Sequence, residues 1–218
     1  SRQGIALGLA MLGLVALGRR ETRWFMFWVL LGATFHKSAV ILLPIAALAA
    51  TRNRYWTALW VGVVLCGAYL LLLEKAVEMY VTRYGMNTVT QSQGTMIRLM
   101  MNAIPAAILL LWRRRFEFSK AEAVLWRWFA IISLALLGLF LVSPSSTAVD
   151  RVALYMLPLQ LVVFAHLPDV FGNRRRRNEV LVAAVLLYYA AVQFVWLNYA
   201  SHAVAWLPYR FYPLEASF

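Results

Sequence analysis

Charged side chains are scarce in this sequence. Only 14% of the 218 residues are charged and 63% are hydrophobic, whereas a soluble domain has about 25% charged and about 45–50% apolar residues. This composition excludes a soluble globular protein. We therefore predict an all-α fold, a polytopic bundle of transmembrane helices that forms a single domain over residues 1–218.

Acidic residues are the rarest charged group, because 9 Asp and Glu stand against 21 Lys and Arg and leave a net charge of +12. Such an excess can indicate nucleic-acid binding. Here, however, the basic residues form short clusters between apolar runs, and the positive-inside rule accounts for that pattern. We predict no nucleic-acid partner and expect membrane lipids to surround the chain.

Cysteine is nearly absent, since Cys66 in the middle of an apolar run is the only one. A single cysteine excludes an internal disulfide and every multi-cysteine metal site. The sequence also lacks a phosphate-binding glycine loop, a dinucleotide fingerprint, a His-Glu-x-x-His motif and clustered carboxylates. We therefore predict neither a metal nor a cofactor. Because the chain opens at Ser1 without an initiator Met, we expect it to be the C-terminal part of a longer membrane protein.

Long apolar runs dominate what is present. About 20 apolar residues cross a bilayer once, and the runs of this chain predict six or seven spans. They are Gly4–Leu17, Trp24–Ala50, Trp56–Leu73, Met96–Trp112, Val124–Val142, Val152–Leu167 and Val180–Leu197. The basic clusters between them are Arg19–Arg23, Arg52–Arg54, Arg113–Arg115 and Arg174–Arg177. Because basic clusters mark the cytoplasmic side, we expect residues 74–95 to form an extracytoplasmic loop and residues 198–218 an extracytoplasmic tail.

The run Trp24–Ala50 is too long for a simple span. Its 27 residues would form a helix of about 40 Å, whereas the bilayer core is about 30 Å thick. A single crossing would also place the Arg19–Arg23 cluster outside. We favour a re-entrant hairpin with its apex at Phe35–Ser38, in a place where protein or a wet cavity surrounds the turn. The alternative is one long tilted helix whose polar residues face the bundle.

The two outer segments are rich in aromatic side chains. Tyr80 and Tyr84 lie at helical spacing in the loop, and Tyr209 lies among the aromatic residues of the tail. Aromatic residues at these positions are typical of an interfacial belt. The competing interpretation is sugar binding, because aromatic faces with neutral hydroxyl and amide groups suit carbohydrate rings.

His36 and Lys37 are the most deeply placed polar residues. Ionisable groups at membrane depth are expensive and are treated as functional hypotheses. One interpretation is that the pair stabilises a turn. The other is proton transfer or anion binding, because histidine exchanges a proton near neutral pH and lysine is a point charge for phosphate.

Arginines on the outer side gain nothing from the positive-inside bias, so each needs a partner. They are Arg2, Arg83, Arg98 and Arg151. For Arg151 the partner could be its neighbour Asp150. The alternative is a phosphorylated ligand, because the guanidinium fork matches phosphate oxygens.

Several of these pieces, in this order, resemble the EpsG family of Wzy-like bacterial exopolysaccharide polymerases. The His-Lys-Ser stretch is the most specific of them, and the likeness covers most of the chain. The matching pieces are Arg2-Gln3, Thr34–Ala39, Tyr80–Tyr84, Asp150-Arg151 with Tyr155, and Leu207–Tyr209.

The resemblance implies a metal-free glycosyltransferase of the bacterial cytoplasmic (inner) membrane. Such enzymes are expected to join oligosaccharides linked to undecaprenyl diphosphate on the outer face, together with polysaccharide export and chain-length proteins. It implies catalytic roles for His36, Arg151 and Arg2. The substrate-binding residues that we assign with it are Lys37, Arg83, Arg98, Tyr80, Tyr84, Asp150, Tyr155 and Tyr209.

Two other classes of function stay open. The first is a different membrane transferase, either an O-antigen ligase or an acyltransferase with His36 as base, although a ligase usually has a larger outer loop than residues 74–95. The second is a transporter or a structural membrane subunit. A transporter should show interrupted spans in two related halves, and only one interrupted run is visible.

Overall fold

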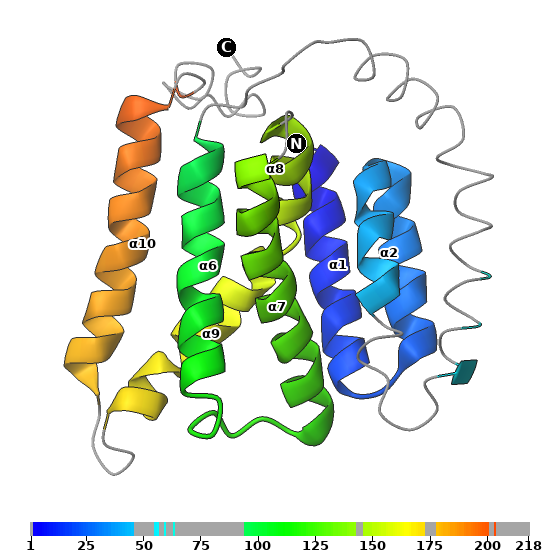
Figure 1. Ribbon diagram of the computed structural model, residues 1–218, viewed down its shortest axis with the longest axis horizontal. Coiled ribbons are helices and arrows are strands. Elements are labelled where there is room, and N and C mark those ends of the chain that lie inside the picture. The colour runs from blue at the N-terminus through cyan, green and yellow to red at the C-terminus, as the bar shows by residue number, and fades with distance from the viewer. Residues whose placement is uncertain are drawn as a thin grey trace, which may run out of the picture. The chain divides into compact units, whose positions relative to one another are not determined.

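The computed structural model describes residues 2–45, 55–56, 59, 63, 94–142, 146–172, 178–200 and 203. Every regular element in these ranges is helical, which confirms the all-α class for the described part of the chain (Figure 1). The elements are α1 (Arg2–Gly18), α2 (Thr22–Phe35), the 3₁₀ helix η1 (Lys37–Leu42), α6 (Thr95–Leu111), α7 (Lys120–Val142), α8 (Ser146–Leu154), α9 (Leu157–Phe171) and α10 (Glu179–Tyr199). The chain divides into two compact units, residues 1–165 and 166–218.

Three helical segments of the described residues are long and apolar enough to cross a membrane: Lys120–Leu141 in α7, Val149–Phe171 in α8 and α9 together, and Glu179–Tyr199 in α10. Two shorter apolar helices, Arg2–Gly18 and Thr95–Leu111, have 17 residues each, or about 25 Å of length. These helices are those of a helical membrane protein. The count of six or seven spans stays a prediction, because most of Trp56–Leu73 lies outside the described residues.

Glycines set the packing of α1 against α2, which lie side by side in Figure 1. A Cβ on Gly32 would come within 3.1 Å of the Ala6 carbonyl oxygen, and one on Gly13 within 3.2 Å of the Phe25 carbonyl oxygen. Each helix therefore approaches the backbone of the other at a position where an added Cβ would be crowded. This contact fixes the position of α2 along α1 and, with it, the position of the residues that follow α2.

The helix α2 ends at Phe35, so the alternative of one continuous helix over Trp24–Ala50 is wrong. His36 has an extended backbone (φ −149°, ψ 110°), and η1 begins at the next residue. The chain then reverses, because the Ala39 Cβ lies 3.7 Å from the Cβ position of Gly32, whereas residues seven apart in a continuous helix are separated by about 10 Å. This break is the one that a re-entrant segment requires, although the far arm, from residue 46 onward, lies mostly outside the described residues.

Two of the basic clusters lie at the same end of the first unit. The α1–α2 turn carries Arg19–Arg23, and the α6–α7 connection carries Arg113–Arg115. The Cβ position of Gly18, at the end of α1, is 3.6 Å from the Glu122 side chain in the first turn of α7. Both connections lie at the lower end in Figure 1. The structure therefore brings together two clusters that the positive-inside rule places on one side of the membrane.

A capping box starts α7 at this end. The Ser119 hydroxyl accepts a hydrogen bond from the Glu122 backbone N–H at 3.3 Å, and the Glu122 carboxylate accepts one from the Ser119 N–H at 3.0 Å. These bonds satisfy two donors that an isolated helix terminus leaves unpaired. The sequence S-K-A-E thus explains why a new helix begins directly after the basic loop.

The apolar run Val152–Leu167, predicted as one span, lies within the candidate span Val149–Phe171, which bends at Tyr155 and Met156, between α8 and α9. Pro158 gives the reason, since it has no N–H to bond the Leu154 carbonyl and its ring clashes with that carbonyl in a straight helix. The Tyr155 and Met156 N–H groups instead bond three residues back, to Val152 and Ala153. Tyr155 therefore lies at a bend.

The second unit contains α10 and the last part of α9. Asn178, which precedes α10, donates its side-chain amide to the Pro168 carbonyl oxygen at 2.7 Å. No residue of α10 is buried by the protein, and the helix is apolar on every side. Such a helix is suited to a lipid environment.

Candidate functional site

Polar residues of three elements meet in the first unit, around the start of η1. The helix α8 packs against both η1 and α6. The 14 residues of α2 raise His36 about 21 Å above the α1–α2 turn. This candidate site therefore lies toward the end of the unit opposite the two basic connections.

The centre of the site is a cluster of three side chains: His36, Ser38 and Tyr155. The Ser38 Oγ lies 2.5 Å from the His36 Nδ1 and donates to the Tyr155 phenolic oxygen at 3.2 Å. The Tyr155 oxygen is in turn 3.5 Å from the same His36 nitrogen. Tyr155 is fully buried, whereas His36 and Ser38 are half-buried. One ring nitrogen of the histidine is therefore held from inside the protein.

The backbone explains why this cluster forms. The extended conformation at His36 turns the chain out of α2, and the 3₁₀ geometry of η1 brings Ser38 back under the imidazole. On the other side, the bend before Pro158 presents Tyr155 to Ser38 across 117 positions of sequence. Two helix breaks thus face each other, each at a place where an unbroken helix would have carried the side chain away.

Arg151 brings positive charge to this cluster. It lies on α8, one turn before Tyr155, whose phenolic oxygen is 3.5 Å from the His36 Nδ1. The packing of α8 against η1 supports the prediction that His36 and Arg151 belong to one site.

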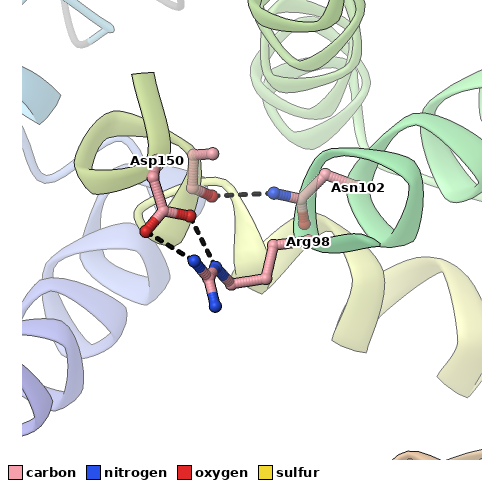
Figure 2. Close-up of polar contacts among 4 residues, drawn as sticks. Arg98, Asn102 and Asp150 are labelled. Carbon is pink, nitrogen blue, oxygen red and sulfur yellow. Dashed lines mark hydrogen bonds and ion pairs between the residues drawn. The ribbon is translucent and has the colours of Figure 1, made fainter. Parts of the chain in front are cut away.

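Asp150, the neighbour of Arg151, is held by a different arginine (Figure 2). The Arg98 Nε bonds Oδ1 of Asp150 at 2.5 Å, and its Nη2 bonds Oδ2 at 2.8 Å. The side chains are 35% and 12% exposed, so water reaches Arg98 more than Asp150. A bidentate pair of this kind is the strong form of the arginine–carboxylate interaction, and it ties α6 to α8.

Asn102, one turn after Arg98 on α6, makes a second tie that the sequence analysis missed. Its side-chain amide donates to the Ala153 carbonyl oxygen at 2.7 Å, as Figure 2 shows. Asn102 is almost fully buried. An amide inside an apolar span is the signal that would have found it, because such residues need a partner in the membrane.

The remaining predicted residues are less constrained by the structure. Arg2 is exposed at the start of α1, and Lys37 is exposed beside His36. Gln3 has a buried side-chain nitrogen without a hydrogen-bond partner among the described residues. Four further predicted residues lie outside the described ranges: Tyr80, Arg83, Tyr84 and Tyr209.

The arrangement provides fixed cations, an imidazole and hydroxyl groups, with one carboxylate that is already paired. Within the described ranges, no three His, Cys, Asp or Glu side chains gather closely enough to hold a metal ion. Guanidinium groups and an imidazole in a partly desolvated site are suited to binding an anion and moving a proton.

Comparisons with known proteins assign the family. No curated protein matches the chain, and no solved structure does. The EpsG family profile, in contrast, matches residues 1–211, nearly the whole sequence. This match confirms the resemblance that was drawn from the His-Lys-Ser stretch and the Asp-Arg pair. The chain is a helical membrane protein that belongs to the EpsG family of Wzy-like polymerases.

Proposed function

We propose that this protein polymerises a bacterial exopolysaccharide, capsule or O-antigen. It transfers a glycan from undecaprenyl diphosphate to a lipid-linked acceptor on the extracytoplasmic face of the inner membrane. The family supports this reaction class. The observation that carries the proposal is that α8, the helix of Arg151, packs against η1, and that the oxygen of Tyr155, one turn after Arg151, lies 3.5 Å from the His36 Nδ1.

The chemistry requires a cation for the leaving group. Breaking the bond between the sugar and the lipid diphosphate builds negative charge on the departing diphosphate. Preorganised positive charge at that position is usually the largest catalytic contribution. We assign this role to Arg151, with Arg2 as a second cation at the start of α1, because a guanidinium binds two phosphate oxygens at once.

The acceptor requires a base. As its hydroxyl oxygen attacks the anomeric carbon, its proton must leave, and histidine is the side chain that exchanges protons near neutral pH. We assign this role to His36. It lies about 21 Å above the basic turn, which in a bilayer core of about 30 Å would put it nearer the extracytoplasmic side.

The other predicted residues define the surroundings of this reaction. Lys37 and Arg98 are proposed to attract the diphosphate, with Asp150 holding Arg98 in place. The aromatic residues of the outer segments, Tyr80, Tyr84 and Tyr209, are proposed to bind the glycan. Export and chain-length proteins are proposed to take the product.

The test is turnover of a lipid-diphosphate-linked oligosaccharide in proteoliposomes that contain the purified chain. We expect the wild type to produce polymer. Arg151→Lys keeps the charge but loses the fork, so it should lower the rate roughly 100-fold, and Arg151→Ala should lower it further. Arg127→Ala is the matched control, because Arg127 is an exposed arginine of α7.

Two results would contradict the proposal. If the wild-type chain releases no lipid diphosphate, the polymerase function is wrong. If Arg151→Ala inserts stably and makes polymer at the wild-type rate, the function stands but the role of Arg151 is wrong.

A further inference from the structure

The two nitrogens of the His36 ring are not equivalent. The Nδ1 is occupied from inside the protein, by the Ser38 Oγ at 2.5 Å and the Tyr155 oxygen at 3.5 Å. The Nε2 makes no hydrogen bond with the described residues. If the ring reacts with a substrate, it therefore does so through Nε2.

The protons of the cluster can be counted. A serine hydroxyl has one proton, and Ser38 donates it to the Tyr155 oxygen. With that proton on the bond to Tyr155, the short contact between Ser38 and His36 is one in which the ring donates from Nδ1 to the Ser38 oxygen. A neutral imidazole that carries its proton on Nδ1 has a free lone pair on Nε2.

We propose that Ser38 and Tyr155 are positioning residues that hold His36 in the tautomer with a free Nε2. This inference rests on the proposed function, and it adds the nitrogen that acts and the residues that prepare it. Tyr155 is fully buried, so its role is to orient Ser38 and not to contact sugar. The chain Nδ1–H to Ser38 to Tyr155 also favours the protonated ring that forms during the reaction.

The proposed step conserves protons and electron pairs. The acceptor O–H bond breaks and its proton binds the Nε2 lone pair. The acceptor oxygen forms a bond to the anomeric carbon, while the bond from that carbon to the diphosphate oxygen breaks and its electron pair leaves with the lipid diphosphate. The protonated ring then releases its proton to water or to the product, with Nδ1–H bonded to Ser38 throughout.

The charged groups around His36 also influence any measurement of its protonation against pH. They are Lys37 on η1, Arg151 on α8, Arg2 on α1, and the Arg98–Asp150 pair between α6 and α8. None of them makes a hydrogen bond to His36 among the described contacts. The Ser38 and Tyr155 hydroxyls are therefore the groups whose removal should change the ring most directly.

Polymerisation by Ser38→Ala, Ser38→Thr and Tyr155→Phe in proteoliposomes, measured against pH, tests this role. Ser38→Ala should lower kcat about 10- to 100-fold with little change in KM. The acid side of its pH profile should move to lower pH, because the protonated ring loses the oxygen that accepts its Nδ1 proton. Ser38→Thr keeps the hydroxyl and should restore most activity and the wild-type profile. Tyr155→Phe should fall between the two.

Ser133→Ala is the matched control. Ser133 is a buried serine of α7 whose hydroxyl donates to the Phe129 carbonyl oxygen of its own helix at 2.8 Å. Its loss should leave both kcat and the pH profile unchanged. An active wild type whose Ser38→Ala variant keeps the wild-type kcat and pH profile would overturn the positioning role and leave the polymerase function intact. An inactive wild type would instead reject the function itself.

A spectroscopic measurement covers the case in which Ser38→Ala does not fold. The wild-type chain is labelled with 15N-histidine, and the His36 signal is the one that disappears in His36→Ala. The chain has 3 histidines, so the assignment is tractable. We expect a neutral ring protonated at Nδ1. A ring protonated at Nε2 would overturn the proposal without reference to activity.

Discussion

Arg98 of α6 holds Asp150 of α8 through two parallel bonds, and Asp150 immediately precedes Arg151 in the chain. The pair therefore sets the position of the helical turn that carries Arg151. The Asn102 side chain donates a hydrogen bond to the same turn, at the carbonyl oxygen of Ala153, two residues after Arg151. The backbone that carries Arg151, the proposed cation for the diphosphate, is in this way held on both sides by side chains of α6.

Asp150→Asn should lower the stability of the protein, because the Arg98 guanidinium loses its charged acceptor. A hydrogen bond to a charged group contributes about 1.5–3 kcal/mol, and partial exposure of Arg98 places the expected loss toward the lower end. Thermal unfolding in detergent measures it. Asp169→Asn, at an exposed carboxylate of α9, is the control and should unfold as the wild type does.

Arg98→Lys gives a second readout of the same pair, since it keeps the charge and loses the fork. We expect it to unfold at a temperature between those of the wild type and Asp150→Asn. If Asp150→Asn and Asp169→Asn unfold at the wild-type temperature, the pair contributes nothing to stability.

Gly32→Ala should destabilise the α1–α2 contact. The added Cβ would lie 3.1 Å from the Ala6 carbonyl oxygen, and a backbone oxygen in a packed helix cannot move away as a flexible side chain can. Gly138→Ala is the opposite case, because nothing lies within 4 Å of its Cβ position. Alanine is favoured over glycine in a helix by roughly 0.5–1 kcal/mol, so this variant should be slightly stabilised. Thermal unfolding measures both variants, and a Gly32→Ala protein that unfolds at or above the wild-type temperature would show that close packing at Gly32 is not limiting.

The two basic connections of the first unit should label from the same side of the membrane. Cysteines placed at Glu21 and Arg114, in a Cys66→Ala background, should both be blocked by a reagent only when it reaches the cytoplasm. A cysteine at Asn53 should behave in the same way if the segment after His36 returns to that side. Labelling of Glu21→Cys from the outside would contradict the re-entrant topology, and labelling of Asn53→Cys alone from the outside would contradict only its returning arm.

Sequence reasoning located the helices well where an apolar run has polar ends. The run Met96–Trp112 corresponds to α6, which begins and ends one residue earlier. The run Val180–Leu197 corresponds to α10, which begins one residue earlier and ends two residues later. The burial of apolar side chains and the avoidance of charge at membrane depth determine these limits, and both are local properties of the sequence. The length of the run Trp24–Ala50 and its polar centre also predict the break at His36, because such a run does not suit a single span.

The partners of the site residues could not be predicted in the same way. The sequence makes Asp150 a candidate partner of its neighbour Arg151. In the structure, however, the Asp150 carboxylate accepts two hydrogen bonds from Arg98, 52 positions away. The meeting of Ser38 with Tyr155 likewise depends on how η1 packs against α8. Such pairs follow from the packing of helices that are distant in sequence. The periodicity of apolar residues does not predict this packing. Pro158, in contrast, is a signal for the bend that can be read from the sequence. The prediction of a span over Val152–Leu167 did not take it into account.

Pro158→Ala tests whether that bend serves the reaction. Alanine restores the N–H that the Leu154 carbonyl lacks and removes the ring that blocks a straight helix, so α8 and α9 can join into one helix. Joining them should stabilise the helix, and it should also rotate Tyr155 away from Ser38. We therefore expect a protein with an unchanged or higher unfolding temperature and a kcat reduced about as much as in Tyr155→Phe. Pro168→Ala, in the second unit, is the matched control and should keep the wild-type kcat. If Pro158→Ala polymerises at the wild-type rate, the bend does not serve the reaction. The contact between Tyr155 and Ser38 then does not depend on Pro158.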